Sequence, residues 1–302
     1  MNRRIFASGI VFVSILLFSP SKANAGLIDF SSSKKTVGQG EIVIIQKNGG
    51  DPNKAFKILF LKEEYSSFLF KKKQTVVLPI PYDLLPGKYW VTGSYETSPG
   101  YFISIGARKI KVIEKYPKHF YLPPKRAKER QEKVNRQSAQ KQEALRVPSQ
   151  YKLKLKSFLR PIKGIKRAQI TSPFGVKRCR RINKNQKSCR YHPGTDYQAA
   201  FDEERSRPEP VRAINDGQVI YAEKHIVEGW VVVIDHGNGI FSESFHLSRV
   251  FVAPGNLVAR GQKIGIAGAS GESAHGIHLH LTIKFFGKYL IDPESLFKSL
   301  GE

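Results

Sequence analysis

The chain has 302 residues, of which 40% are hydrophobic and 11% aromatic, enough to build more than one folded domain. Its 50 basic and 25 acidic residues give a formal net charge of +25, which excludes an acidic solvating protein and favours a polyanionic partner. Two cysteines exclude a disulfide-dense miniprotein and a cysteine-rich zinc module. Seven of the eight histidines follow residue 190, so histidine chemistry is expected in the last third of the chain.

Residues 1–25 have the pattern of a Sec-type signal peptide. Arg3 and Arg4 precede an apolar run of 14 residues, and Ala23-Asn24-Ala25 forms an A-x-A cleavage site. The run is shorter than the roughly 20 residues that a membrane-spanning helix needs, although an uncleaved anchor is the alternative. Cleavage after Ala25 predicts a periplasmic or secreted protein, which argues against nucleic acid as the partner.

Residues 26–115 are predicted to form a β-sandwich accessory domain. Short β-rich runs alternate with Gly and Pro turns, a spacing typical of a sandwich. The runs lie at residues 41–46, 56–61, 75–80, 89–92 and 108–113. This segment contains no histidine and shows no catalytic constellation, so we expect a scaffold or binding module.

Residues 116–165 are predicted to be a basic, partly helical linker. They carry 14 basic and 3 acidic residues, and Pro123-Pro124 separates them from the preceding β pattern. Residues 125–146 are charged and Gln-rich without a wide apolar stripe, which predicts a solvated helix or arm. The alternative is electrostatic docking on anionic envelope polymers or lipid head groups.

Two histidine motifs lie in residues 166–302, a second mainly β segment. His192 and Asp196 form an H-x-x-x-D motif, and His278 and His280 form an H-x-H motif. On a strand, residues i and i+2 point to one face about 6.5–7 Å apart, so one imidazole can bind a metal while the other reaches a reacting oxygen. Two histidines and one carboxylate suit Zn²⁺ and leave a fourth position open, as catalytic zinc sites do.

With these motifs the segment resembles the lysostaphin/LytM family of peptidoglycan-cleaving zinc metallopeptidases. Further matches are the first strand at residues 170–175, the A-x-x-x-G-x-V stretch at residues 213–219, His246-Leu247 and the turn at residues 258–268. The resemblance implies an antiparallel β peptidase domain over residues 166–302. It implies His192, Asp196 and His280 as zinc ligands and His246 and His278 as the catalytic pair, with the division of roles between these two open.

The resemblance has departures. The acidic residue that often follows H-L-H in the family is replaced by Leu281-Thr282. His236 and His275 have no matching ligand role, and His119 and His225 match no pattern and are predicted to lie at the surface.

The first domain also resembles a known one, the β-sandwich that precedes this peptidase domain in some Gram-negative envelope enzymes. The matching residues are Val37, Gly40-Glu41, Leu78-Pro79-Ile80-Pro81 and Pro86-Gly87-Lys88-Tyr89.

Together the two resemblances predict a zinc endopeptidase that cuts cross-links or stem peptides of peptidoglycan. The alternatives are a non-catalytic wall-binding protein or amidase activator of the same fold, and a metallopeptidase that acts on proteins. The bond that is cleaved and the oligomeric state stay open.

The two cysteines, Cys179 and Cys189, bracket a basic loop just before His192. In an exported protein, two cysteines this close predict a disulfide. Zinc ligation by the pair is disfavoured, because the His/Asp set is already complete.

Overall fold

The computed structural model describes residues 28–117, 128–146, 155–163, 169–198, 201–202, 207–208 and 210–301. The predicted signal peptide, residues 1–25, and His119 lie outside the described residues. Among the described residues, no helix is both long and apolar enough to cross a membrane.

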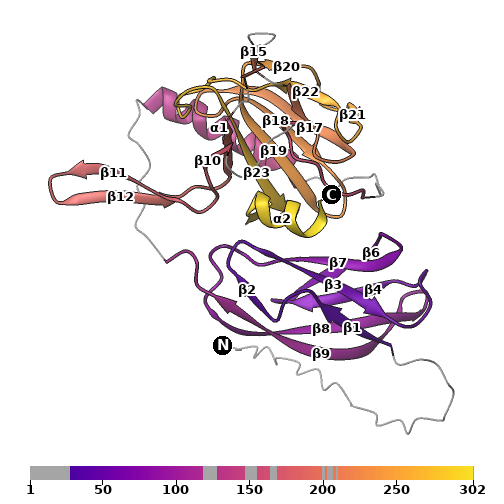
Figure 1. Ribbon diagram of the computed structural model, residues 1–302. Helices are drawn as coiled ribbons and strands as arrows, with labels where there is room; N and C mark the ends of the chain where they lie inside the picture. The colour runs from indigo at the N-terminus through magenta and orange to yellow at the C-terminus, as the bar shows by residue number, and fades with distance from the viewer. Residues whose placement is uncertain are drawn as a thin grey trace, which may run out of the picture.

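The N-terminal part is a β-sandwich built from two sheets (Figure 1). One sheet has the order β1-β3-β7-β6 and the other the order β2-β9-β8-β4-β5. Buried and exposed positions alternate along β4 and the middle of β8, so apolar side chains from both sheets meet between them. The strands are β1 Asp29–Ser32, β2 Thr36–Gly38, β3 Ile42–Asn48, β4 Phe56–Phe60, β5 Glu63–Ser66, β6 Phe68–Phe70, β7 Lys73–Pro79, β8 Gly87–Ser98 and β9 Tyr101–Ile113.

The C-terminal part is dominated by an antiparallel sheet with the order β10-β13-β23-β19-β18-β17-β21, to which β24 adds beside β23. A smaller sheet, β16-β22-β20, packs beside it, and β11-β12 and β14-β15 are two-stranded hairpins. The mainly β fold class is therefore confirmed. The strands are β10 Ile170–Ser172, β11 Lys177–Asn183, β12 Gln186–Tyr191, β13 Thr195–Gln198, β14 Phe201–Asp202, β15 Arg207–Pro208, β16 Pro210–Arg212, β17 Gly217–His225, β18 Gly229–Asp235, β19 Ile240–Leu247, β20 Arg249–Val250, β21 Leu257–Val258, β22 Lys263–Ile266, β23 His278–Phe285 and β24 Tyr289–Ile291.

The helix α1 (Lys128–Ala144) comes from the basic linker. Its own side chains are mostly solvated, as the sequence predicts, but the helix is not a free arm. The side chain of Gln137 bonds the backbone at both Lys224 and Ile226, and Leu145, just after the helix, is buried in a cluster with Phe241 and Phe245. The helix is therefore docked on the C-terminal sheet by polar contacts and one apolar anchor.

The β-sandwich packs against α2 (Pro293–Leu300), which lies between the two parts of the chain (Figure 1). The backbone N–H of Asp292 donates to the carbonyl of Gly40 at 2.8 Å, and the N–H of Ile42 donates to Ser295 Oγ at 3.1 Å. Ile42, with Phe70 and Val77, belongs to the same buried apolar cluster as the C-terminal sheet. Backbone bonds and a shared core therefore join the two parts.

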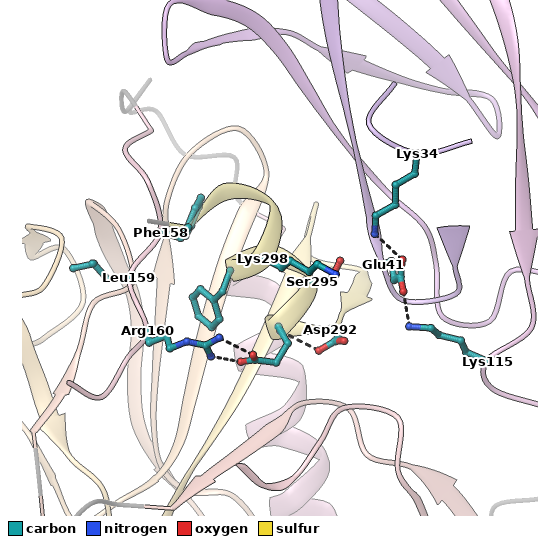
Figure 2. Close-up of a pocket in the computed structure, with 12 residues that line it drawn as sticks. Lys34, Glu41, Lys115, Phe158, Leu159, Arg160, Asp292, Ser295 and Lys298 are labelled. Carbon is teal, nitrogen blue, oxygen red and sulfur yellow. Dashed lines mark hydrogen bonds and ion pairs between the residues drawn. The ribbon is translucent and has the colours of Figure 1, made fainter. Parts of the chain in front are cut away.

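A cavity of about 650 Å³ lies at this junction (Figure 2). On the sandwich side, Glu41 is bonded to Lys34 at 2.7 Å and to Lys115 at 2.5 Å. On the other side, Arg160 forms a two-pronged ion pair with Glu294. These five charged groups are thus paired within each part.

Candidate metal centre and its groove

Three side chains from two paired strands and the turn before them converge on one point. His192 Nε2 lies 2.9 Å from His280 Nδ1, and Asp196 Oδ1 lies 2.7 Å from His280 Nδ1 and 3.1 Å from His192 Nε2. Asp196 on β13 is the direct cross-strand partner of His280 on β23. The strand pairing thus brings together two motifs that lie 84 residues apart.

The remaining nitrogen of each converging imidazole is held by an oxygen. His192 Nδ1 lies 3.0 Å from the carbonyl of Pro173, and His280 Nε2 lies 3.1 Å from Thr282 Oγ1. Because each of these nitrogens donates to its oxygen, His192 Nε2 and His280 Nδ1 carry the lone pairs that face the shared point. Thr282 therefore provides the outer contact at the place where the family often has an acidic residue.

Two further histidines stand beside this point. The ring centroids of His246 and His278 are 4.9 Å apart, and His246 lies 6.0 Å from His280. His278 Nε2 is 3.8 Å from Asp196 Oδ1. The Nδ1 atoms of His246 and His278 bond the carbonyls of Ser270 and Gly276, which leaves both Nε2 atoms as acceptors.

A β-bulge aims His246. The pairing of β18 with β19 shifts between Trp230 and Val232, so that two residues of β19 oppose one of β18. His246 lies in this bulge with a φ of 63°, a left-handed conformation that is rare for a residue other than glycine. Such strain is typical of functional positions and turns the imidazole toward His278.

Burial favours the neutral form of two histidines in this cluster, His280 and His246. It lowers the pKa of His280 to about 4, with the neighbouring His192 acting in the same direction. Burial and the neighbouring His278 also lower the pKa of His246. For Asp196, burial opposes ionisation, but the adjoining imidazoles of His192 and His280 hold its pKa well below the usual range. At neutral pH, His280 is therefore an unprotonated imidazole and Asp196 a carboxylate, the forms that bind a metal.

The donor set fits zinc. Within the part of the chain that the structure describes, His192, Asp196 and His280 form a group whose ligand atoms all lie within 4.8 Å of one another. Tetrahedral bonds of about 2.0–2.1 Å place two ligand atoms roughly 3.3 Å apart, close to the separations observed here. All three side chains are buried, which is expected where a metal later compensates the cost of burying their polar groups.

The cluster lies in a groove of about 1230 Å³. One wall is α1, which contributes Gln131, Val134, Ser138 and Lys141, and the other is the β11-β12 hairpin. Lys141 lies 3.5 Å from the buried Glu243 and 4.5 Å from the centroid of the Phe245 ring, which in turn lies 5.2 Å from His280. Sequence reasoning missed these wall residues, because their only signal is proximity across the fold.

The hairpin is closed by the predicted disulfide between Cys179 and Cys189, which are cross-strand partners. Its neighbour Arg178 reaches into the groove and donates to Asp196 Oδ2 at 2.5 Å. No motif flagged Arg178, although it lies only 18 residues before Asp196. The hairpin therefore both borders the groove and contacts the metal centre.

The other histidines occupy separate places. His275 lines the groove outside the cluster. His236 is buried and bonds the carbonyl of Asp216 and Ser242 Oγ. The prediction that His225 lies at the surface is wrong: it is 2% exposed and lies between Tyr221 and Glu228. His225 ends β17 at a buried position directly after the exposed Glu223 and Lys224.

Comparison with known proteins agrees with this geometry. Residues 190–293 match Peptidase family M23, which confirms the resemblance that the histidine motifs predicted. The peptidoglycan DD-endopeptidases ShyB and ShyA of Vibrio cholerae are 36% identical over 115 residues and 35% identical over 120 residues. The DD-carboxypeptidase/endopeptidase Mpg of Neisseria meningitidis is 35% identical over 120 residues.

These matches are partial. They cover 38–40% of this chain and 25–26% of the relatives, so the chain spans about a quarter of the length of the curated relatives it matches. A crystal structure of a putative peptidase M23 from Pseudomonas aeruginosa aligns over 85% of this chain and 93% of its own, with a TM-score of 0.61 and 22% identity. That alignment is too long to involve the C-terminal sheet alone, so the two proteins share a fold that extends into the N-terminal part.

Proposed function

We propose that this protein is a zinc-dependent endopeptidase that hydrolyses peptide bonds in peptidoglycan, in the periplasm or outside the cell. The observation that carries the proposal is the convergence of His192, Asp196 and His280 beside the two acceptor nitrogens of His246 and His278. The M23 match and the names of the relatives support peptidoglycan as the substrate.

His192, Asp196 and His280 would hold the zinc ion. Zinc in such a site supplies Lewis-acid polarisation of a carbonyl group and lowers the pKa of water. The protein orients its ligands in advance, because Pro173 and Thr282 fix the outer nitrogens of the two imidazoles. Phe245 packs beside His280 and covers an apolar side of the site.

His246 and His278 are the groups that would move protons. Each has its Nδ1 tied to a backbone carbonyl and its Nε2 left as an acceptor, the arrangement of a general base. After accepting a proton, the same nitrogen can return it to the departing amine or donate to a developing oxyanion. The backbone bonds hold both rings in place throughout, so little reorganisation is needed.

The groove suits a substrate that carries carboxylates. Arg180 and Arg190 line the wall formed by the hairpin, and Arg190 lies across from Arg178, whose guanidinium binds Asp196. Stem peptides of peptidoglycan carry free carboxylates, which arginine side chains pair with well.

The test is digestion of purified sacculi, followed by mass spectrometry of the released fragments. We expect the wild-type chain to release cross-link or stem-peptide fragments and chelation to stop the release until zinc is restored. His246→Ala and His278→Ala should each lower the rate about 10²–10⁴-fold while zinc stays bound. His275→Ala is the matched control, because this histidine lines the same groove outside the cluster.

Other outcomes identify the alternatives. Binding to sacculi without fragment release would indicate a wall-binding protein or amidase activator of the same fold. Cleavage of proteins with intact sacculi would indicate a protein-directed metallopeptidase. Equal activity of His246→Ala, His278→Ala and the wild type would contradict the proposed catalytic pair.

A further inference from the structure

Arg178 contacts the metal centre from outside the histidine cluster. Its Nη2 atom donates to Asp196 Oδ2 at 2.5 Å and to Ser172 Oγ at 2.8 Å. The other carboxylate oxygen, Asp196 Oδ1, faces His192 and His280. The two oxygens of Asp196 therefore have separate partners.

This division matters for metal binding. A carboxylate can rotate and bind a metal through one oxygen or through both, and each choice changes the number of ligands. A charge-assisted hydrogen bond from a guanidinium holds one oxygen in a defined direction. With Oδ2 engaged by Arg178, only Oδ1 points to the shared point.

The fold keeps Arg178 within reach of Asp196. Arg178 precedes Cys179, and the Cys179–Cys189 disulfide joins the two hairpin strands one position further out. A two-stranded hairpin alone is marginally stable, so this covalent link limits fraying.

A second support lies at the base of the hairpin. The Tyr116 ring packs at centroid distances of 5.7 Å from Phe174 and 5.2 Å from Tyr191, and the hydroxyl of Tyr191 donates to the carbonyl of Pro117 at 2.5 Å. Residues that follow the β-sandwich thus hold the hairpin that carries Arg178.

We propose that Arg178 is a positioning residue that holds Asp196 as a one-oxygen ligand and thereby strengthens zinc binding. The proposal rests on the proposed function, because it requires the metal at His192, Asp196 and His280. It adds a role for a residue outside the histidine motifs. It also links zinc affinity to the disulfide-closed hairpin.

The test compares the zinc affinity of variants by competition with a chromophoric chelator, independently of lytic activity. Arg178→Gln removes the charge and the forked donor, and we expect the zinc dissociation constant to rise about 10–100-fold. Arg178→Lys keeps the charge and should recover part of that loss. Arg181→Gln is the matched control: it removes an exposed arginine from the same strand and should leave the affinity within about twofold of wild type.

A spectroscopic measurement separates positioning from a general loss of structure. In the Co²⁺-substituted protein, the visible absorption reports the number and geometry of the ligands. Arg178→Gln should change the intensity of these bands, since Asp196 is then free to rotate, while Arg181→Gln should not. If Arg178→Gln does not fold, Arg178→Lys decides the matter, because it keeps the positive charge but loses the planar donor group and should still bind zinc more weakly than the wild type.

The outcomes distinguish the two proposals. Failure of the wild-type chain to bind zinc overturns the proposed function and this proposal together. If the wild type binds zinc tightly and Arg178→Gln leaves the affinity and the spectra unchanged, the role of Arg178 alone is overturned. Where Arg178→Gln does not fold, the same result in Arg178→Lys overturns it.

Discussion

Replacing Asp292 by Asn should stabilise the protein at neutral pH. Asp292 caps the N-terminus of α2, where its side chain accepts from the backbone N–H of Glu294 at 3.0 Å. It sits at the junction with the β-sandwich, close to Glu41 and Lys115 (Figure 2). Burial raises the pKa of Asp292 to about 6, and the negative charges of Glu294 and Glu41 act in the same direction. The hydrogen bond from the Glu294 N–H and the charge of Lys115 oppose this increase but do not cancel it.

The sign and size follow from this shift. The usual pKa of the group is 3.8. Between about pH 4 and pH 6, Asp292 is therefore protonated in the folded chain but has lost its proton in the unfolded chain. Stability therefore falls as the pH rises through this window, by at most ~3 kcal/mol at ~1.4 kcal/mol per pKa unit. Partial solvent exposure of Asp292 screens the charge and reduces the expected value to ~1–2 kcal/mol. Asn is as good a helix cap as Asp, so the variant keeps the cap without the charge.

The assay is denaturant unfolding of wild type and Asp292→Asn at pH 4 and pH 7. The difference between the two proteins should be near zero at pH 4 and reach ~1–2 kcal/mol in favour of the variant at pH 7. Asp83→Asn, which removes an exposed carboxylate of the β-sandwich, is the control and should show no such change with pH. A pH-independent difference for Asp292→Asn, or a less stable variant at pH 7, would refute the reasoning.

Two further predictions concern the groove. Leu145 is 3% exposed and anchors α1 to the sheet, so Leu145→Ala should weaken docking of the helix by ~2–4 kcal/mol. Faster amide hydrogen exchange in α1 would show this weakening, and unchanged exchange would contradict it. Gly194→Ala should lower zinc affinity, because a Cβ there would lie 2.3 Å from the carbonyl oxygen of Leu281 and 2.7 Å from His280 Nε2. Wild-type affinity in a chelator competition would show that the turn yields instead.

Much of the metal centre could be predicted from the sequence. His192, Asp196, His246, His278 and His280 lie in short motifs whose residue types are the donors that zinc prefers. The structure places all five around one point, and their roles stay a prediction until zinc binding and hydrolysis are measured. Short motifs suffice here because strand geometry fixes which neighbours share a face.

The short strands of the β-sandwich were harder to predict. The five β-rich runs correspond to long or central strands such as β3, β7 and β9, whereas β1, β2, β5 and β6 have only three or four residues each. Such strands are stabilised by their partners, so they carry little pattern of their own. The surface prediction for His225 was wrong for a similar reason, because its burial depends on contacts with Tyr221 and Glu228 in the folded sheet.

The sequence by itself determined the β-rich character and the ligand chemistry, because each is encoded within a few consecutive residues; the export signal is predicted on the same basis. Only the tertiary structure decided that Arg178 engages Asp196, that Thr282 supports His280 and that Lys141 of the linker helix lies against Glu243 in the groove. These contacts depend on where the hairpin, the bulge and the helix come to rest. Their positions follow from packing and strand pairing between segments far apart in the chain, and no local sequence pattern predicts such contacts.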